Sequence, residues 1–522
     1  MKKFLCLFQA LLLLWSCEGA FDDPESAGGG FITTEHGMIV LGERLEDPYS
    51  VDNVTKAVET LYPTKAGRVR IDPTDYYVRF LPRDRSQYDE LVSLGLDLLD
   101  HPMDYRIVRD GDYYVDPEVG EESITWQYTV VRSGFDFPED IRYEILDECY
   151  IAEHSSTKAS DVDWDAVERE AYLLTGNADF LSAESRAGTE TAAPKGRIAI
   201  VDEAYDTEPV GVAGVKVTCN SFVKIASAFT DEEGYYEIPK SYSTDIRYRI
   251  VFKNQKGFAI GFNLVLVPAS VSTLGKNGPK GVSVVIDSKS DRKLFDRCAV
   301  NNAAFGYYER CKSGAGMSPP PSDLRIWLFH RLSRSSTVMM QQGAVIDKSL
   351  VADYLGEYSS ILKMFLPDVT LGLKDKEFDY QAIYSQTLHQ LAHSGHFSLC
   401  GKDWWDNYVK FLLTSFVTSG WVAYGVGTED GAGYAEIAEM WAFYVQTLLT
   451  RERYGESVSS YGTSFWFHPQ IFLTLNDRGL DCCKLSLALT PDVADRSVLQ
   501  ERLLALYPEY KSIINQTFLR YL

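Results

Sequence analysis

Hydrophobic and polar positions alternate in the first part of the chain and predict short strands. Residues 74–82, TDYYVRFLP, follow this pattern and end at a proline. Residues 86–96, SQYDELVSLGL, instead have the apolar spacing of a short helix, with Ser86 as a plausible N-cap. Residues 96–108 return to the strand pattern. We therefore predict a small α+β domain over residues 33–150.

A helical linker is predicted next, over residues 151–193. Residues 164–175 have a helical pattern. Residues 185–196, SRAGTETAAPKG, are rich in Gly, Ala, Thr and Ser, which is typical of a boundary between domains.

Alternation returns in residues 194–288, for which we predict a β-sandwich. The apolar positions that mark half-buried strands are Ile198, Ile200, Val215 and Val217. Asp231 to Gly234 form a predicted turn before the strand YYEIP. The opening GRIAIVD and the segment TDEEGYYEIP resemble the carboxypeptidase-regulatory-like domain, a small sandwich of transthyretin type. This resemblance implies a spacer or binding module without catalytic residues.

The apolar spacing becomes helical from about residue 290, so residues 289–522 are predicted to form a mainly helical domain. The helical segments are residues 348–365, 383–397, 404–417, 434–455 and 499–510. The expected fold is therefore multidomain, with an α+β unit, a β-sandwich and a helical domain in chain order.

Three of the eight histidines lie within eight residues of the second helical segment, as HQLAHSGH. His389 and His393 are four residues apart, so on a helix they share one face and can bind one metal ion. His396 lies seven residues after His389, which is too far along a straight helix unless the helix breaks at Gly395. The alternative is a pair of buried histidines that are satisfied by hydrogen bonds in the core.

A third ligand is expected from residues 433–445, GYAEIAEMWAFYV, a strong helical segment that carries Glu436 and Glu439. Two imidazoles and one carboxylate suit zinc and leave a fourth position for water. Asp430 in GTEDGAGYA is a weaker candidate. Its surroundings resemble the aspzincin loop, but Tyr434 follows one residue too late for that pattern.

The combination of HQLAHSGHF, the following WW, and EIAEMWAFY resembles zinc-metallohydrolase lipoproteins of the Bacteroides group, which are gluzincin-like. This resemblance implies a zinc peptidase site with His389 and His393 as ligands and Glu439 of EMW as the third. Glu436 is the second choice for that position. The departure from the family pattern is Gln390, which occupies the position of the catalytic glutamate of H-E-x-x-H.

Glutamine at position 390 changes the expected chemistry. The family's glutamate accepts a proton from the metal-bound water, and a positioned base of this kind contributes about 10²–10⁴-fold to the rate. Glutamine cannot accept that proton, so metal binding should survive while hydrolysis is impaired or lost. Either His396, Glu436 or Tyr424 acts as a substitute base, or the domain is a pseudoenzyme that holds a peptide or glycan.

The first 17 residues have the features of an export signal. Lys2 and Lys3 precede an apolar run from Phe4 to Trp15 that is too short to span a bilayer. The run ends in LWSC, which resembles a bacterial lipobox with Cys17 as the acylated residue. Cleavage by an ordinary signal peptidase a few residues later is the alternative.

Composition and charge argue against some functions and indicate a location for the protein. The formal net charge of −23 over 522 residues argues against nucleic-acid binding, since few phosphates could be neutralised. Residues 18–32 resemble the flexible acidic tether of surface lipoproteins in the same bacterial group, which implies a lipid-anchored protein at the outer membrane or cell surface. Of nine cysteines, Cys298 and Cys311 could pair across a loop.

These observations predict a cell-surface lipoprotein with a zinc-binding, metallopeptidase-like domain of weak or absent activity. One alternative is an active zinc peptidase that uses a substitute base on a peptide or protein substrate. The other is a metal-free component of a surface nutrient-uptake system that binds a peptide or glycan.

We predict that Cys17 is lipid-modified, because LWSC follows a basic and apolar leader. Radiolabelled palmitate should be incorporated into the protein in cells, and Cys17→Ala should abolish the labelling. Labelling that persists in this variant would contradict the prediction.

Overall fold

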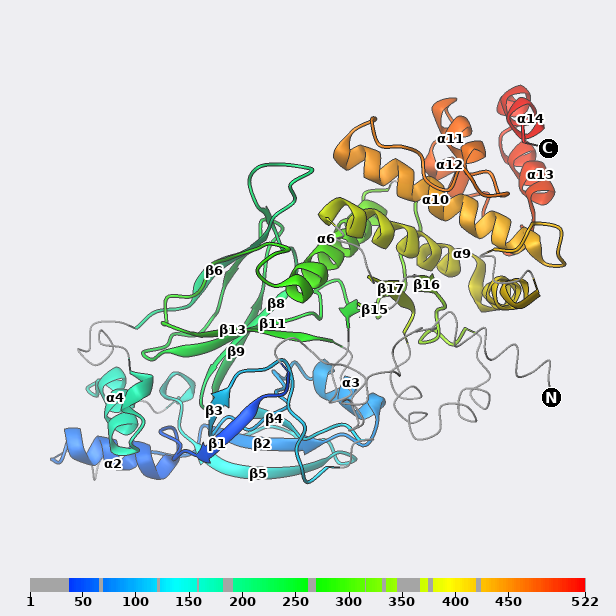
Figure 1. The fold of residues 1–522 in the computed structure, drawn as a ribbon. Helices are drawn as coiled ribbons and strands as arrows, with labels where there is room; N and C mark the ends of the chain where they lie inside the picture. The colour runs from blue at the N-terminus through cyan, green and yellow to red at the C-terminus, as the bar shows by residue number, and fades with distance from the viewer. Residues whose placement is uncertain are drawn as a thin grey trace, which may run out of the picture.

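The computed structural model describes most of the chain after the leader. The described residues are 37–64, 69–119, 123–156, 159–181, 191–261, 269–314, 316–330, 335–344, 367–373, 379–418 and 424–521. Cys17, the tether and the predicted helix 348–365 lie outside these residues. The protein is multidomain, and Figure 1 shows sheets near one end of the molecule and a mainly helical region at the other.

The N-terminal part contains both predicted element types. β2 (Asp75–Leu81) is the central strand of an antiparallel sheet between β4 (Gln127–Arg132) and β5 (Arg142–Cys149). α3 (Arg85–Ser93) follows β2, as its pattern predicted. Its N-cap is Asp84 rather than Ser86, because the Asp84 side chain accepts a hydrogen bond from the backbone N–H of Gln87.

Smaller elements complete this part of the molecule. β1 (Val40–Arg44) pairs with β3 (Tyr105–Arg109), which lies in the segment predicted to return to strand. α2 (Val51–Leu61) packs against α4 (Trp164–Leu174), and the second of these helices was predicted from its pattern.

Two sheets form the middle of the chain and enclose a shared apolar core. In the first, β6 (Lys195–Ile200) lies between β10 (Tyr235–Glu237) and β14 (Val284–Ile286), and β7 (Val210–Gly211) also pairs with β6. The order in the second is β13 (Val271–Asn277), β11 (Ile246–Val251), β8 (Lys216–Ser221) and β9 (Lys224–Phe229). Ile198 and Ile200 of one sheet belong to the same buried cluster as Val217 and Ile250 of the other. The alternation seen in the sequence therefore reflects inward-facing positions.

The C-terminal part is mainly helical, as predicted. Its helices are α6 (Arg292–Lys312), α9 (Tyr380–Thr418), α10 (Ala432–Tyr454), α11 (Gln470–Asp477), α12 (Cys482–Ser486), α13 (Arg496–Leu506) and α14 (Lys511–Leu519). None of the helices in the described ranges combines the length and apolar character needed to cross a membrane.

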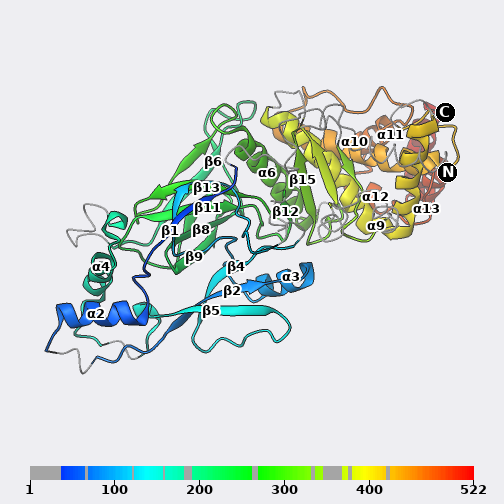
Figure 2. The same ribbon diagram turned by 60° about the horizontal axis from the view of Figure 1, so that its bottom comes forward.

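A small sheet accompanies these helices and was not expected from the sequence. Its strand order is β12 (Ala259–Ile260), β15 (Arg325–Phe329), β17 (Val369–Gly372) and β16 (Ser336–Thr337). β16 and β17 pack against α9. Figure 2 shows the β12 and β15 side of this sheet next to α6. Strands of two to five residues are too short to show a clear alternation, which explains why the pattern of the sequence did not reveal them.

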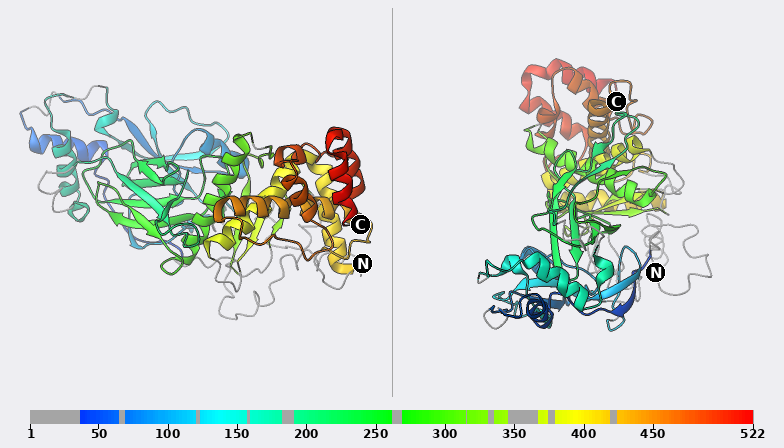
Figure 3. Two further views of the ribbon diagram at one scale, coloured as in Figure 1. Left: turned by 90° about the horizontal axis from the view of Figure 1, so that it is seen from above. Right: turned by 90° about the vertical axis from the view of Figure 1, so that its left-hand side faces the viewer.

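A buried ion pair joins the middle sheets to the helical region. Asp202 follows β6 and is fully buried, and its Oδ2 accepts hydrogen bonds from Arg453 Nη2 at 2.7 Å and Tyr454 Oη at 2.9 Å. β12 adds a second link, because it belongs to the middle of the chain but pairs with β15. Figure 3 shows the two regions continuous along the long axis of the molecule.

The described cysteines are free thiols. Cys298 is buried in α6 and Cys311 lies near the end of the same helix, and neither forms a disulfide. The pairing that the sequence left open is therefore absent from the structure.

We predict that Asp202→Asn destabilises the protein by about 2–4 kcal/mol, because it leaves Arg453 without its buried counter-charge. The measurement is the midpoint of urea unfolding, followed by circular dichroism. Glu452→Gln is the matched control. This change removes the ion pair between Glu452 and Arg310, whose side chains are 42% and 40% exposed, respectively. It should lower the free energy of unfolding by less than about 1 kcal/mol. Equal shifts for the two variants would contradict a special role for Asp202.

Candidate metal centre

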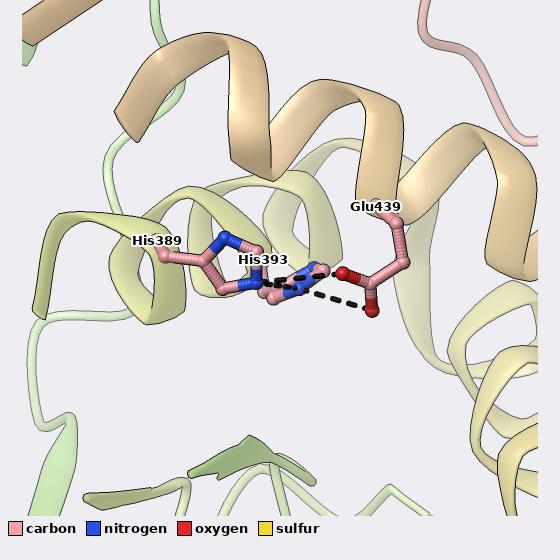
Figure 4. A group of neighbouring side chains, drawn as sticks. All are labelled: His389, His393 and Glu439. Atoms are coloured by element: carbon pink, nitrogen blue, oxygen red, sulfur yellow. Dashed lines mark hydrogen bonds and ion pairs between the residues drawn. The ribbon is translucent and has the colours of Figure 1, made fainter. Parts of the chain in front are cut away.

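Two packed helices, α9 and α10, bring the candidate ligands together. His389 and His393 lie one turn apart on α9, so their rings project from the same face. Glu439 lies on α10, which packs along α9. Figure 4 shows the two imidazoles and the carboxylate directed toward one another between the helices.

The three side chains converge closely. The Nε2 atoms of His389 and His393 are 3.1 Å apart. Glu439 places Oε2 3.4 Å from Nε2 of His389 and Oε1 3.5 Å from Nε2 of His393. One ligand atom from each residue lies within 4.8 Å of the other two. This buried group can hold a metal ion.

Neighbouring groups orient the ligands. Oε1 of Gln446 lies 3.2 Å from Nδ1 of His389 and accepts a hydrogen bond from its N–H, which leaves the Nε2 lone pair directed at the site. The hydroxyl of Tyr408 donates to Oε1 of Glu439 at 2.7 Å. Oε2 of Glu439 is buried and has no hydrogen-bond partner among the described residues. A buried carboxylate oxygen in this state is costly unless a cation lies near it.

Burial favours the protonation states that bind metal. His393 is 2% exposed, and burial lowers the pKa of its imidazole, so the ring is neutral near neutral pH. Burial alone would raise the pKa of Glu439, but its close contact with the two imidazoles outweighs burial and lowers the pKa well below its usual value. Neutral imidazole and ionised carboxylate are the forms that coordinate metals.

The other candidate ligands lie outside this group. Glu436 forms an ion pair with Arg496, whose Nε lies 3.2 Å from its Oε1. Asp430 is exposed on the loop before α10. Neither residue belongs to the cluster of potential ligand atoms.

His396 also lies outside the group, because α9 does not break at Gly395. The helix kinks instead at Gly401, where φ is +77°. His396 is fully buried and packs against the ring of Trp404, with 4.6 Å between ring centroids. Burial lowers its pKa to about 3, so it is a neutral ring that packs in the core.

Gln390 follows His389 on α9, and its side chain contacts the small sheet. Its Oε1 accepts a hydrogen bond from the Thr337 hydroxyl on β16 at 2.8 Å, and both side chains are buried. Tyr424 lies on the loop before α10 with a left-handed φ of +67°, which is rare for a residue with a bulky side chain. Its carbonyl oxygen accepts a hydrogen bond from the indole N–H of Trp466.

Sequence reasoning missed Tyr408 and Gln446. Tyr408 follows the kink at Gly401, and no local pattern shows that the second half of α9 turns back toward Glu439. Gln446 lies seven residues after Glu439, two turns along α10, which is the spacing of one helix face. That spacing is the one signal that could have identified it.

We predict that Tyr408→Phe lowers the affinity for Zn²⁺ by about 10- to 100-fold, because the Glu439 carboxylate loses the hydroxyl that orients it. Competition with a chromogenic chelator measures this affinity. Tyr444→Phe is the control, since its hydroxyl donates to Asn476 and not to the site. Unchanged Zn²⁺ affinity in Tyr408→Phe would contradict this role.

Comparisons with models of known protein families, with curated proteins and with solved structures find no match to this chain. The geometry of the site therefore carries the functional argument.

Proposed function

We propose that this protein is a cell-surface lipoprotein whose helical domain binds one zinc ion through His389, His393 and Glu439. We further propose that the domain is related to gluzincin metallopeptidases and that Gln390 leaves it weakly active or inactive. The observation that carries the proposal is the convergence of two Nε2 atoms and one carboxylate in a buried position.

The spacing of the ligand atoms supports zinc. Bonds of about 2.0–2.1 Å in a tetrahedral arrangement place any two ligand atoms about 3.3 Å apart. In the structure the two Nε2 atoms are 3.1 Å apart, and Glu439 brings one oxygen to 3.4 Å from Nε2 of His389 and its other oxygen to 3.5 Å from Nε2 of His393. Two imidazoles with one carboxylate are a common donor set of catalytic zinc sites, in which water completes the coordination.

Gln390 supports the proposal that hydrolysis is weak or absent. Bound zinc would acidify its water ligand and polarise a substrate carbonyl, and neither effect needs residue 390. A base at position 390 would take the proton from that water, but the neutral amide cannot. The Thr337 hydroxyl donates to the amide oxygen, so this oxygen already accepts a hydrogen bond.

The surroundings of His396 and Glu436, two candidate substitute bases, also support impaired hydrolysis. His396 is enclosed next to Trp404, and its pKa of about 3 leaves little proton affinity at neutral pH. Glu436 is paired with Arg496. Each residue is already engaged away from the ligand group.

A peptide fits the site better than other classes of ligand. Within the described part of the sheet, β16 is an edge strand, and Thr337 of this strand contacts Gln390 on the metal-binding helix. An edge strand offers unpaired backbone groups to an extended peptide. A peptide that paired with β16 would lie near Gln390, which follows His389 on α9.

The test of the proposal is Gln390→Glu. Glutamate has the same shape, and the Thr337 hydroxyl can donate to its carboxylate, so the variant should fold and keep its zinc. Hydrolysis of an unfolded protein substrate should rise by about 100-fold or more over the wild type. Release of labelled peptides from casein measures the activity, and elemental analysis measures the zinc.

Three controls define the outcome. Gln390→Glu combined with His393→Ala should lose both zinc and activity. Gln500→Glu, the same change on α13, where the half-buried side chain contacts Asn515, should leave both unchanged. Zinc content that is unchanged in His393→Ala places the metal elsewhere and overturns the assignment of the site. Undetectable hydrolysis by zinc-loaded Gln390→Glu contradicts the role of Gln390 as the limiting residue.

A further inference from the structure

The surface next to the metal centre is aromatic. Phe443 lies one turn after Glu439 on α10, and its ring centroid is 4.4 Å from that of His389. Phe465 and Phe467, from the loop after α10, stack on Phe443 at 5.8 and 5.7 Å. We call Phe443, Phe465, Phe467 and Tyr424 the aromatic wall.

The two loops that carry the wall are held in place by close contacts. The rings of Phe465 and Phe467 are 5.0 Å apart and nearly parallel, and Tyr424 meets both edge-on at 5.3 and 5.4 Å. Trp466 Nε1 donates to the Tyr424 carbonyl at 2.9 Å. A side chain at Gly462 would collide with the ring of Phe443, whose nearest atom lies 2.4 Å from the position of the added Cβ. These contacts therefore hold the rings of the aromatic wall in defined positions.

Part of the wall faces solvent. Phe465 is 37% exposed, and Phe443 and Tyr424 are half-buried, whereas Phe467 is fully buried behind them. The open area of Phe465 is removed from water when an apolar group packs on it, and this burial favours binding.

We propose that the aromatic wall is the specificity surface of the site, with Phe465 as its determining residue. This inference rests on the proposed function. The wall accepts a large apolar side chain, preferably aromatic, of the peptide held at the metal centre. A ring packed against Phe465 gains both area burial and an aromatic contact, which together correspond to about tenfold or more in affinity.

A peptide side chain suits the wall better than a sugar. The three phenylalanines carry no polar atoms on their side chains, and the near-parallel rings turn their faces toward one another. The nearby Glu429 already accepts hydrogen bonds from the backbone N–H groups of Val426, Gly427 and Thr428. The three phenylalanine side chains therefore offer a sugar no hydrogen bond, while an apolar side chain needs none.

The experiment uses small hydroxamates, because this group anchors to a bound zinc ion whether or not the site is catalytically active. Acetohydroxamate, L-alanine hydroxamate and L-phenylalanine hydroxamate are titrated into the zinc-loaded full chain by calorimetry. We expect the phenylalanine compound to bind about tenfold or more tightly than the alanine compound. Phe465→Ala should reduce this ratio to below about threefold, and Phe465→Tyr should restore it.

The outcomes separate this inference from the proposed function. If the chain holds no zinc and acetohydroxamate does not bind, the proposed function fails. If acetohydroxamate binds and the two amino-acid compounds bind equally, the inference about the wall is overturned while the metal site stands. Tyr235→Ala, which removes an exposed aromatic ring from the distant β10, should keep the wild-type ratio. Loss of the ratio in Tyr235→Ala, or tighter binding of a neutral oligosaccharide than of L-phenylalanine hydroxamate, would also overturn the inference.

Discussion

The packing of α9 against α10 is the interaction on which the candidate site depends. Side chains as short as His and Glu reach one another only if the helices approach closely. Alanines are buried in both helices and lie in one apolar cluster, namely Ala392 on α9 and Ala435, Ala438 and Ala442 on α10. Small residues lower the distance at which two helices pack. The same apolar core that holds the helices together thus sets the separation between the histidines and Glu439.

Close packing also determines the electrostatics of the site. Burial removes water from the Glu439 carboxylate, and the enclosed charge needs a cation or several donors nearby. The Tyr408 hydroxyl supplies one donor, and it reaches the carboxylate only because α9 changes direction at Gly401. A glycine is suited to that kink because a positive φ costs it little. The apolar packing, the kink and the polar contacts are therefore parts of one arrangement, and a metal ion would compensate the remaining carboxylate oxygen.

Local sequence patterns predicted the elements of the fold better than their connections. Helix periodicity identified α4, α10 and most of α9, and the spacing of His389 and His393 follows directly from that periodicity. The short strands of the C-terminal sheet escaped detection because two to five residues contain too few alternations. The cap of α3 was displaced by two residues, since Asp84 and Ser86 are both good capping residues and tertiary context decided between them. Tyr408 and Gln446 could not be assigned to the site, because their roles depend on how two helices lie in space.

Gln390 changes more than the proton chemistry of the proposed zinc site. A zinc ion with Glu439 as its one anionic ligand has a net charge of about +1. A glutamate at position 390 would bring the summed charge of the zinc ion and the two carboxylates to about zero. With glutamine the centre stays positive in surroundings of low polarity, where charge acts strongly. Such a centre would attract a peptide carbonyl or a terminal carboxylate, but it would lack a base at position 390 to take a proton from bound water. The aromatic wall would add apolar contacts to that attraction. If the site holds zinc as proposed, glutamine at position 390 would therefore favour holding a peptide over cutting it, a consequence that goes beyond the lack of a base.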